Sequence, residues 1–139
     1  VMDASPEGAI ELFHGYTYSG IPVAVSAALA VQEIFEKEDI FNRVKKISNY
    51  FQEGLHSLKD INCVESIRNY GLLGGIDIQM RDKPGKAGFQ VYKECYNAGI
   101  NIKPTGDALI IAPPFICDKK HIDEIIEKLR KGINSYNKI

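Results

Sequence analysis

The residue types most able to do chemistry gather in one short segment near the N-terminus. Residues 13–22 read Phe-His-Gly-Tyr-Thr-Tyr-Ser-Gly-Ile-Pro, so glycines and the hydroxyl side chains of Thr17 and Ser19 precede a predicted helix. Glycine lets a ligand approach the backbone, and the first N–H groups of a helix lack intrahelical acceptors, so this arrangement suits a phosphate or another anion. Helix caps and turns use the same residue types, which leaves a purely structural explanation open.

Lys103 is a second candidate, because it directly precedes the turn-forming sequence Pro-Thr-Gly-Asp at residues 104–107. Its ammonium group could anchor a carboxylate. It could equally be an ordinary solvated lysine beside a loop.

Other common kinds of site are not expected. His14 has no histidine or carboxylate at ligand spacing, which argues against a metal site. The glycines of residues 71–75 do not match the dinucleotide fingerprint and are better explained by close strand packing. No Ser, His and acid set and no Cys and His pair indicates a nucleophile. Cys63, Cys95 and Cys117 are far apart in sequence, and we expect them to be reduced thiols in the core.

The composition is that of an ordinary globular domain. The chain has 139 residues and a net charge of −1, which offers no electrostatic footprint for nucleic acid or an acidic membrane surface. The longest apolar run, residues 21–31, is interrupted by Pro22 and Ser26 and is too short to span a membrane. The N-terminal residues do not resemble a signal or transit peptide. We expect a soluble, cytoplasmic protein.

Two helices are predicted in the first part of the chain. Residues 22–37 form the first, with Ser19 and Gly20 supplying its cap and Pro22 in its first turn. Its apolar residues lie on every side, which is typical of a helix that is buried all round, but a domain of this size has few places to bury one. We therefore expect this helix to keep an exposed apolar strip or to cover that strip against another copy of the chain. Residues 39–58 form the second, which has a single apolar stripe of the ordinary surface kind.

The remaining sequence predicts strands and helices in alternation. Strands are expected at residues 63–69 and 72–80, followed by a helix at 87–98 that ends at Gly99. Residues 100–103 and 108–112 should form a hairpin, and Asp118 should cap a last helix. Strands joined by short turns, with helices between the pairs, predict an α+β fold with a small antiparallel sheet covered by helices on one side.

Three stretches together resemble the class III aminotransferases that use pyridoxal phosphate, most closely the omega-amino acid:pyruvate type. Residues 14–22 are similar to the family's His-Gly-aromatic-Thr-Tyr-Ser-Gly-His-Pro motif, with Ile21 in place of the second histidine. Residues 68–76 resemble its Arg-x-x-Gly-Leu-x-x-x-Ile strand pair. Residues 103–107 and 112–114 resemble its Arg-Pro-Thr-Gly-Asp turn and the following Pro-Pro, with Lys103 in place of the arginine.

The resemblance implies roles for three residues. In the family, the threonine of the first motif binds the cofactor phosphate of the opposite subunit, which corresponds to Thr17, and Tyr16 beside it contributes backbone. The arginine of the turn binds the substrate carboxylate, which corresponds to Lys103. The family's cofactor-binding lysine and its aspartate for the pyridine nitrogen have no counterpart in this sequence, so we expect this chain to be inactive alone.

The sequence therefore predicts a C-terminal part of a pyridoxal phosphate-dependent aminotransferase, acting as a homodimer. Residues 1–38 would end the cofactor domain and form a connecting helix, and residues 39–139 would form the C-terminal small domain. The reaction would move an amino group from an amine or omega-amino acid to a keto acid such as pyruvate. The alternative is a free-standing, non-catalytic α+β module that binds a ligand or mediates assembly.

Overall fold

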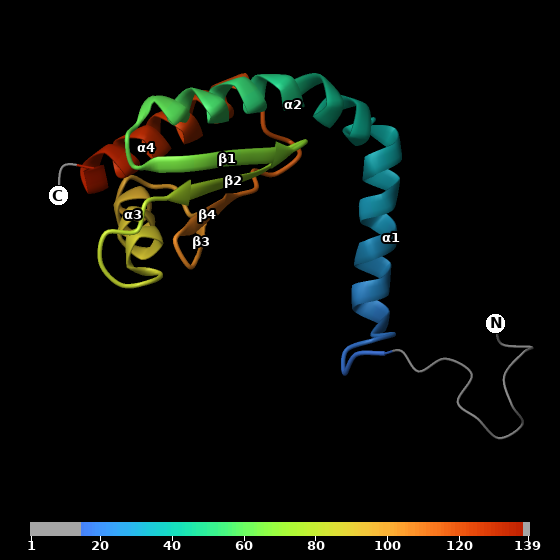
Figure 1. Cartoon of the computed structure of the whole chain (residues 1–139). Helices are drawn as coiled ribbons and strands as arrows, with labels where there is room; N and C mark the ends of the chain where they lie inside the picture. The colour runs from blue at the N-terminus through green and yellow to red at the C-terminus, as the bar shows by residue number, and fades with distance from the viewer. Residues whose placement is uncertain (1–14, 138–139) are drawn as a thin grey trace, which may run out of the picture. The chain divides into compact units, whose positions relative to one another are not determined.

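The computed structural model describes residues 15–137, which Figure 1 shows as a coloured ribbon. The chain divides into two compact units, Val1–Glu38 and Asp39–Ile139. Among the described residues, no helix is both long enough and apolar enough to cross a membrane.

The first unit contains helix α1, Pro22–Lys37, whose bounds match the helix expected from the sequence. Pro22 occupies its first turn as predicted, but the predicted cap is wrong. The N-cap residue is Ile21, whose side chain makes no capping hydrogen bond. Ser19 bonds to the preceding turn instead of the helix, because its Oγ accepts a hydrogen bond from the backbone N–H of Tyr16 at 2.8 Å. Serine hydroxyls bond to nearby backbone in turns as readily as in caps, which is why residue type alone misassigned it.

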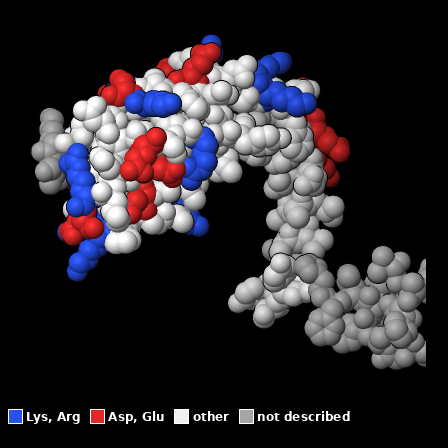
Figure 2. All heavy atoms as spheres, in the orientation of Figure 1, with Lys and Arg blue, Asp and Glu red and all other residues white. Residues whose placement is uncertain are grey.

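Helix α1 buries none of its residues among the described part of the chain, in agreement with the exposed apolar strip expected from the sequence. Val23 is 79% exposed and Leu29 62% exposed. Figure 2 shows most of this helix free of charged side chains, which are confined to its C-terminal turns.

The second unit is built on a four-stranded antiparallel sheet in the order β1-β2-β4-β3. Its strands are β1 (Val64–Tyr70), β2 (Leu73–Ile78), β3 (Lys103–Thr105) and β4 (Ala108–Ile111). Gly71 opens the two-residue turn between β1 and β2 with a positive φ of 54°, which glycine adopts at little cost. The predicted antiparallel α+β architecture is confirmed.

Helices cover one face of this sheet (Figure 1). They are α2 (Ile40–His56), the 3-10 helix η2 (Ser57–Asp60), α3 (Lys86–Asn97) and α4 (Lys119–Asn137). Phe51 and Leu55 of α2 are fully buried, and a Cβ at Gly74 of β2 would stand 2.6 Å from Leu55 Cδ2. Gly74 therefore lets helix α2 and the sheet meet closely, a contact between helix and strand rather than the packing between strands expected from the sequence.

The first strand of the second hairpin lies further along the chain than predicted, whereas the second strand begins at Ala108 as predicted. Strand β3 begins at Lys103 and includes Pro104, which the sequence had assigned to the turn. The turn consists of Gly106 and Asp107 alone, because Thr105 pairs with Ala108. Proline is tolerated here because β3 is an edge strand, where the missing N–H breaks no ladder on the open side.

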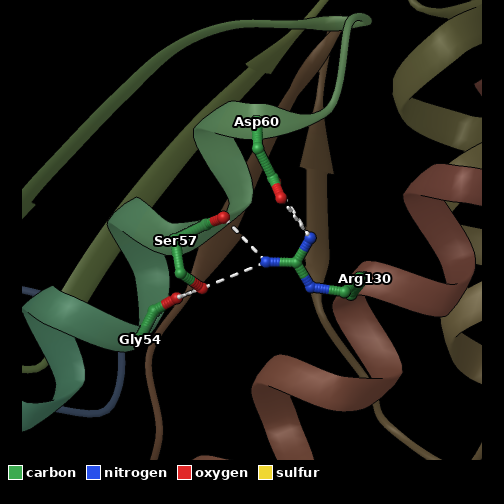
Figure 3. Close-up of polar contacts among 4 residues, drawn as sticks. All are labelled: Gly54, Ser57, Asp60 and Arg130. Carbon is green, nitrogen blue, oxygen red and sulfur yellow. Dashed lines mark hydrogen bonds and ion pairs between the residues drawn. The ribbon is translucent and has the colours of Figure 1, made fainter.

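Arg130 of α4 ties that helix to the end of α2 and to η2 (Figure 3). One guanidinium nitrogen donates to both carboxylate oxygens of Asp60, at 2.8 and 3.0 Å. The other donates to the carbonyl oxygen of Ser57 at 2.7 Å and to its Oγ at 3.2 Å. Ser57 Oγ in turn donates to the carbonyl oxygen of Gly54 at 2.7 Å, so the contact fixes the C-terminal turn of α2 against α4.

Several local predictions are confirmed by single contacts. Asp118 caps α4, since its Oδ1 accepts a hydrogen bond from His121 N at 3.1 Å. Gly99 ends α3 with a positive φ of 89°. Cys63, Cys95 and Cys117 are free and buried, and burial raises the pKa of the Cys95 thiol to about 12, which keeps it protonated.

Candidate functional site

The turn that precedes α1 is the first part of the candidate site. Tyr16 and Ser19 close it with two hydrogen bonds, from Tyr16 N to Ser19 Oγ and from Ser19 N to the carbonyl oxygen of Tyr16 at 2.9 Å. Gly20, which follows the turn, has a positive φ of 74°. Thr17 lies inside the turn and is exposed. The structure therefore presents the Thr17 hydroxyl on a short, internally bonded loop.

This turn has the space and the donors that an anion needs. A Cβ placed at Gly15 or at Gly20 would meet no atom within 4 Å, so a ligand could approach the backbone on both sides. The first turn of α1 has no side-chain cap, which leaves its N–H groups without a side-chain acceptor. A phosphate would find a hydroxyl donor at Thr17 and the positive end of the helix dipole beside it. His14, which begins the motif, lies outside the described residues.

Lys103 lies in the second unit, on the face of the sheet opposite to the helices. It is exposed, and it opens edge strand β3. Cross-strand pairing places Lys103 opposite Ile110, Ile110 opposite Gly75, and Gly75 opposite Arg68. Paired residues of an antiparallel sheet share a face, so these residues form one row across all strands. The row carries a cation at each end, Arg68 and Lys103.

Sequence reasoning noted Arg68 only as part of a motif and missed its partner. Its guanidinium donates to Asp77 Oδ2 at 2.5 Å, and Ser66 donates to the same oxygen. The hydrogen bonds that Asp77 accepts, first from Arg68 and then from Ser66, lower the pKa of Asp77, and the bond that Arg68 donates to Asp77 raises the pKa of Arg68. Arg68 and Asp77 belong to different strands, so only the register of β1 against β2 reveals the pair.

A shallow hollow lies on this open face, between Arg68 and Ile110. Tyr70 and Leu73 form its rim, and both are exposed, at 89% and 53%. The Arg68 side chain crosses its floor, since a Cβ at Gly75 would lie 3.4 Å from Arg68 Cγ, Nε and Cζ. Asp77 neutralises Arg68, whereas Lys103, the other cation of this row, forms no ion pair with the described residues.

The sequence-predicted site residues fall in different units. Tyr16 and Thr17 belong to Val1–Glu38, and Lys103 belongs to Asp39–Ile139. Within residues 15–137, no group of three or more His, Cys, Asp or Glu side chains is placed to hold a metal ion.

Nearly the whole chain matches a family of enzymes. Residues 1–133 match the family described as Aminotransferase class-III. The chain therefore belongs to the class III aminotransferases.

Named relatives agree with this assignment. The chain is 40% identical over 135 residues to an omega-aminotransferase of Caulobacter vibrioides, covering 94% of this chain and 31% of that protein. It is 35% identical to an omega-amino acid–pyruvate aminotransferase of Pseudomonas putida, covering 94% and 29%. The chain thus spans about a third of the length of the curated relatives it matches.

Solved structures give the same answer. The adenosylmethionine-8-amino-7-oxononanoate aminotransferase of Methanocaldococcus jannaschii matches with a TM-score of 0.80 at 32% identity, covering 89% of this chain and 30% of that one. An omega transaminase from Pseudomonas jessenii matches with a TM-score of 0.82 at 25% identity, covering 90% and 29%.

Proposed function

We propose that this chain is the C-terminal part of a pyridoxal phosphate-dependent transaminase that moves an amino group from an amine or omega-amino acid to a keto acid such as pyruvate. The match of residues 1–133 to the class III aminotransferases carries the proposal. The names of the similar proteins, omega-aminotransferase and omega-amino acid–pyruvate aminotransferase, support the choice of substrates. Family membership favours this function over a free-standing, non-catalytic module.

We assign the cofactor phosphate to the turn before α1. Thr17 would donate its hydroxyl, and Tyr16 would contribute backbone. The open space around Gly15 and Gly20 and the uncapped first turn of α1 fit such a group. When bound, pyridoxal phosphate supplies the electron sink that transamination needs, and this turn would orient it.

We assign the carboxylate of the substrate to Lys103. Its position at the exposed start of β3 leaves its ammonium group accessible. A lysine offers a point charge rather than the planar fork of an arginine, so it should hold a carboxylate less tightly. This substitution suits an enzyme whose substrates include amines that carry no carboxylate.

We further propose a cytoplasmic homodimer, in which residues 1–38 end the cofactor domain and connect it to the small domain of residues 39–139. Buried, unpaired cysteines support the compartment, since oxidising compartments favour disulfides. The uncovered apolar surface of α1 supports assembly with further protein, because large exposed apolar patches usually mark contacts.

The test is cofactor binding and amino transfer by the full-length protein that contains this chain. Titration with pyridoxal phosphate, followed by absorbance, should show saturable binding, and an omega-amino acid with pyruvate should yield alanine. The 139-residue chain alone should do neither and should form no covalent adduct at a unique lysine. A full-length protein that binds no cofactor would contradict the proposal and favour the non-catalytic module.

A further inference from the structure

The turn between β3 and β4 is fastened to the start of helix α3 by one side chain, that of Asp107. Its Oδ2 accepts a hydrogen bond from Gly85 N at 2.9 Å. Its Oδ1 accepts from Ala87 N at 3.0 Å and from Gly88 N at 3.3 Å. Gly85, the N-cap residue of α3, has no side chain to cap the helix, so Asp107 caps it from a distant part of the sequence.

The backbones of helix and turn also touch. A Cβ at Gly88 would stand 2.3 Å from the carbonyl oxygen of Gly106 and 3.2 Å from Asp107 Cα, so only glycine permits this approach. On its other side, the carbonyl oxygen of Asp107 accepts a hydrogen bond from Ile78 N of β2 at 2.9 Å. The turn is therefore held between α3 and the sheet.

The other end of β3 is held by the same helix. Ile100 N donates to the carbonyl oxygen of Cys95 in α3 at 3.0 Å, and Ile102 is buried in the core. Lys103 follows directly, pairs with Ile110 and precedes Pro104. A residue before proline is restricted to extended backbone, so Lys103 keeps a free side chain on a nearly fixed backbone.

We propose that Asp107 is a positioning residue that sets where the ammonium group of Lys103 stands, by locking β3 to helix α3. This inference rests on the proposed function of Lys103 as the anchor for a substrate carboxylate. Asp107 itself touches no substrate. Its three backbone contacts fix the hairpin, and small displacements of a binding group cost much of its effect.

The experiment compares two donors that differ by a carboxylate, 4-aminobutyrate and butylamine, in the donor half-reaction of the full-length, cofactor-loaded enzyme. Asp107→Ala should raise KM for 4-aminobutyrate by about tenfold, which is less than the roughly hundredfold that a displacement of about 1 Å can cost. The kcat for 4-aminobutyrate and both constants for butylamine should stay nearly unchanged. Asp107→Asn, which keeps one acceptor oxygen, should recover part of the loss. Lys103→Ala should likewise impair 4-aminobutyrate and spare butylamine. The double variant should raise KM for 4-aminobutyrate little further, because both changes remove the same interaction with the carboxylate.

Asp118→Ala is the matched control, because Asp118 caps α4 in the same way but lies outside the hairpin. It should lower the melting temperature without changing the ratio between the two donors. Hydrogen exchange at Gly85, Ala87 and Gly88 should accelerate in Asp107→Ala and not in Asp118→Ala.

Two outcomes overturn the inference in distinguishable ways. If Lys103→Ala discriminates between the donors and Asp107→Ala affects both alike or neither, Asp107 has no positioning role. If Lys103→Ala itself does not discriminate, the proposed role of Lys103 is wrong and the inference falls with it. Should Asp107→Ala fail to fold, Asp107→Asn provides the same test, because it keeps one acceptor oxygen for the start of α3 and removes the other.

Discussion

Helices α1 and α2 follow one another along the chain and have 16 and 17 residues, yet they differ in how much of their apolar surface is buried. Helix α2 buries Ile40, Phe51 and Leu55 and turns its charged residues outward. Helix α1 buries nothing, although its sequence is the more apolar of the two. The difference lies in pattern: the apolar residues of α2 fall on one stripe, and those of α1 surround the axis.

The contrast separates two sources of stability. The core around α2 is made within residues 39–139, where the apolar side of each helix meets the sheet. The apolar surface of α1 has no such cover among residues 15–38, so its sequence is suited to contacts with further protein. The candidate phosphate-binding turn belongs to that region, and the candidate carboxylate anchor belongs to the self-supporting one.

Truncating one large apolar residue in each helix tests whether the two helices differ in their contribution to stability. Phe51→Ala removes a fully buried ring from α2 and should cost about 3–5 kcal/mol of unfolding free energy. Leu29→Ala in α1 should cost less than about 0.5 kcal/mol in the 139-residue chain, because Leu29 is already 62% exposed. Urea unfolding followed by circular dichroism measures both. A large loss for Leu29→Ala would show that α1 is covered within this chain.

Sequence patterns predicted most features that depend on residues within one element, although the cap of α1 at Ser19 and Gly20 was wrong. The bounds of α1, the cap at Asp118 and the termination at Gly99 depend on neighbouring residues, and all are confirmed. The assignment of Pro104 to a turn was wrong, because only the strand order shows that β3 is an edge strand. The same limit applied to the site: the Asp107 contacts join residues about 20 positions apart, and no local pattern reveals them.

Thr17→Val in the full-length protein tests the first region through its proposed ligand. A hydroxyl that donates to a phosphate contributes about 1.5–3 kcal/mol, so cofactor affinity should fall roughly ten- to a hundredfold. Absorbance titration of the apoenzyme measures it. Thr105→Val, in edge strand β3, is the matched control, since it changes the same residue type in the other unit. Unchanged affinity in Thr17→Val would leave Thr17 with only a role in the turn.

Lys103→Arg should have a smaller effect, in the second region. The arginine fork can make two parallel hydrogen bonds to a carboxylate, so catalytic efficiency toward omega-amino acids should rise roughly five- to thirtyfold, or about 1–2 kcal/mol. Efficiency toward a simple amine should stay the same. Equal efficiencies of the two variants with both donors would show that this position does not touch the substrate.

The smallest effect concerns Asp77, on the open face of the sheet. Hydrogen bonds from Arg68 and Ser66 lower the pKa of Asp77 in the folded chain, so the pair stabilises the fold above the carboxyl group's unfolded pKa of about 3.9. That contribution to the free energy of unfolding should decline as the pH falls below about 3.9 toward the lower pKa that Asp77 has in the folded chain. Asp77→Asn should therefore lower the urea midpoint slightly at pH 7, and the difference between wild type and variant should shrink steadily as the pH falls below about 3.9. Glu33→Gln, in the exposed pair with Lys37 on α1, should leave the midpoint unchanged at either pH, because exposed pairs along a helix contribute little. A difference between wild type and Asp77→Asn that persisted at the lowest pH would mean that Asp77 acts through packing rather than through its charge. The contribution of its ion pair to stability would then no longer differ from that of the exposed pair on α1.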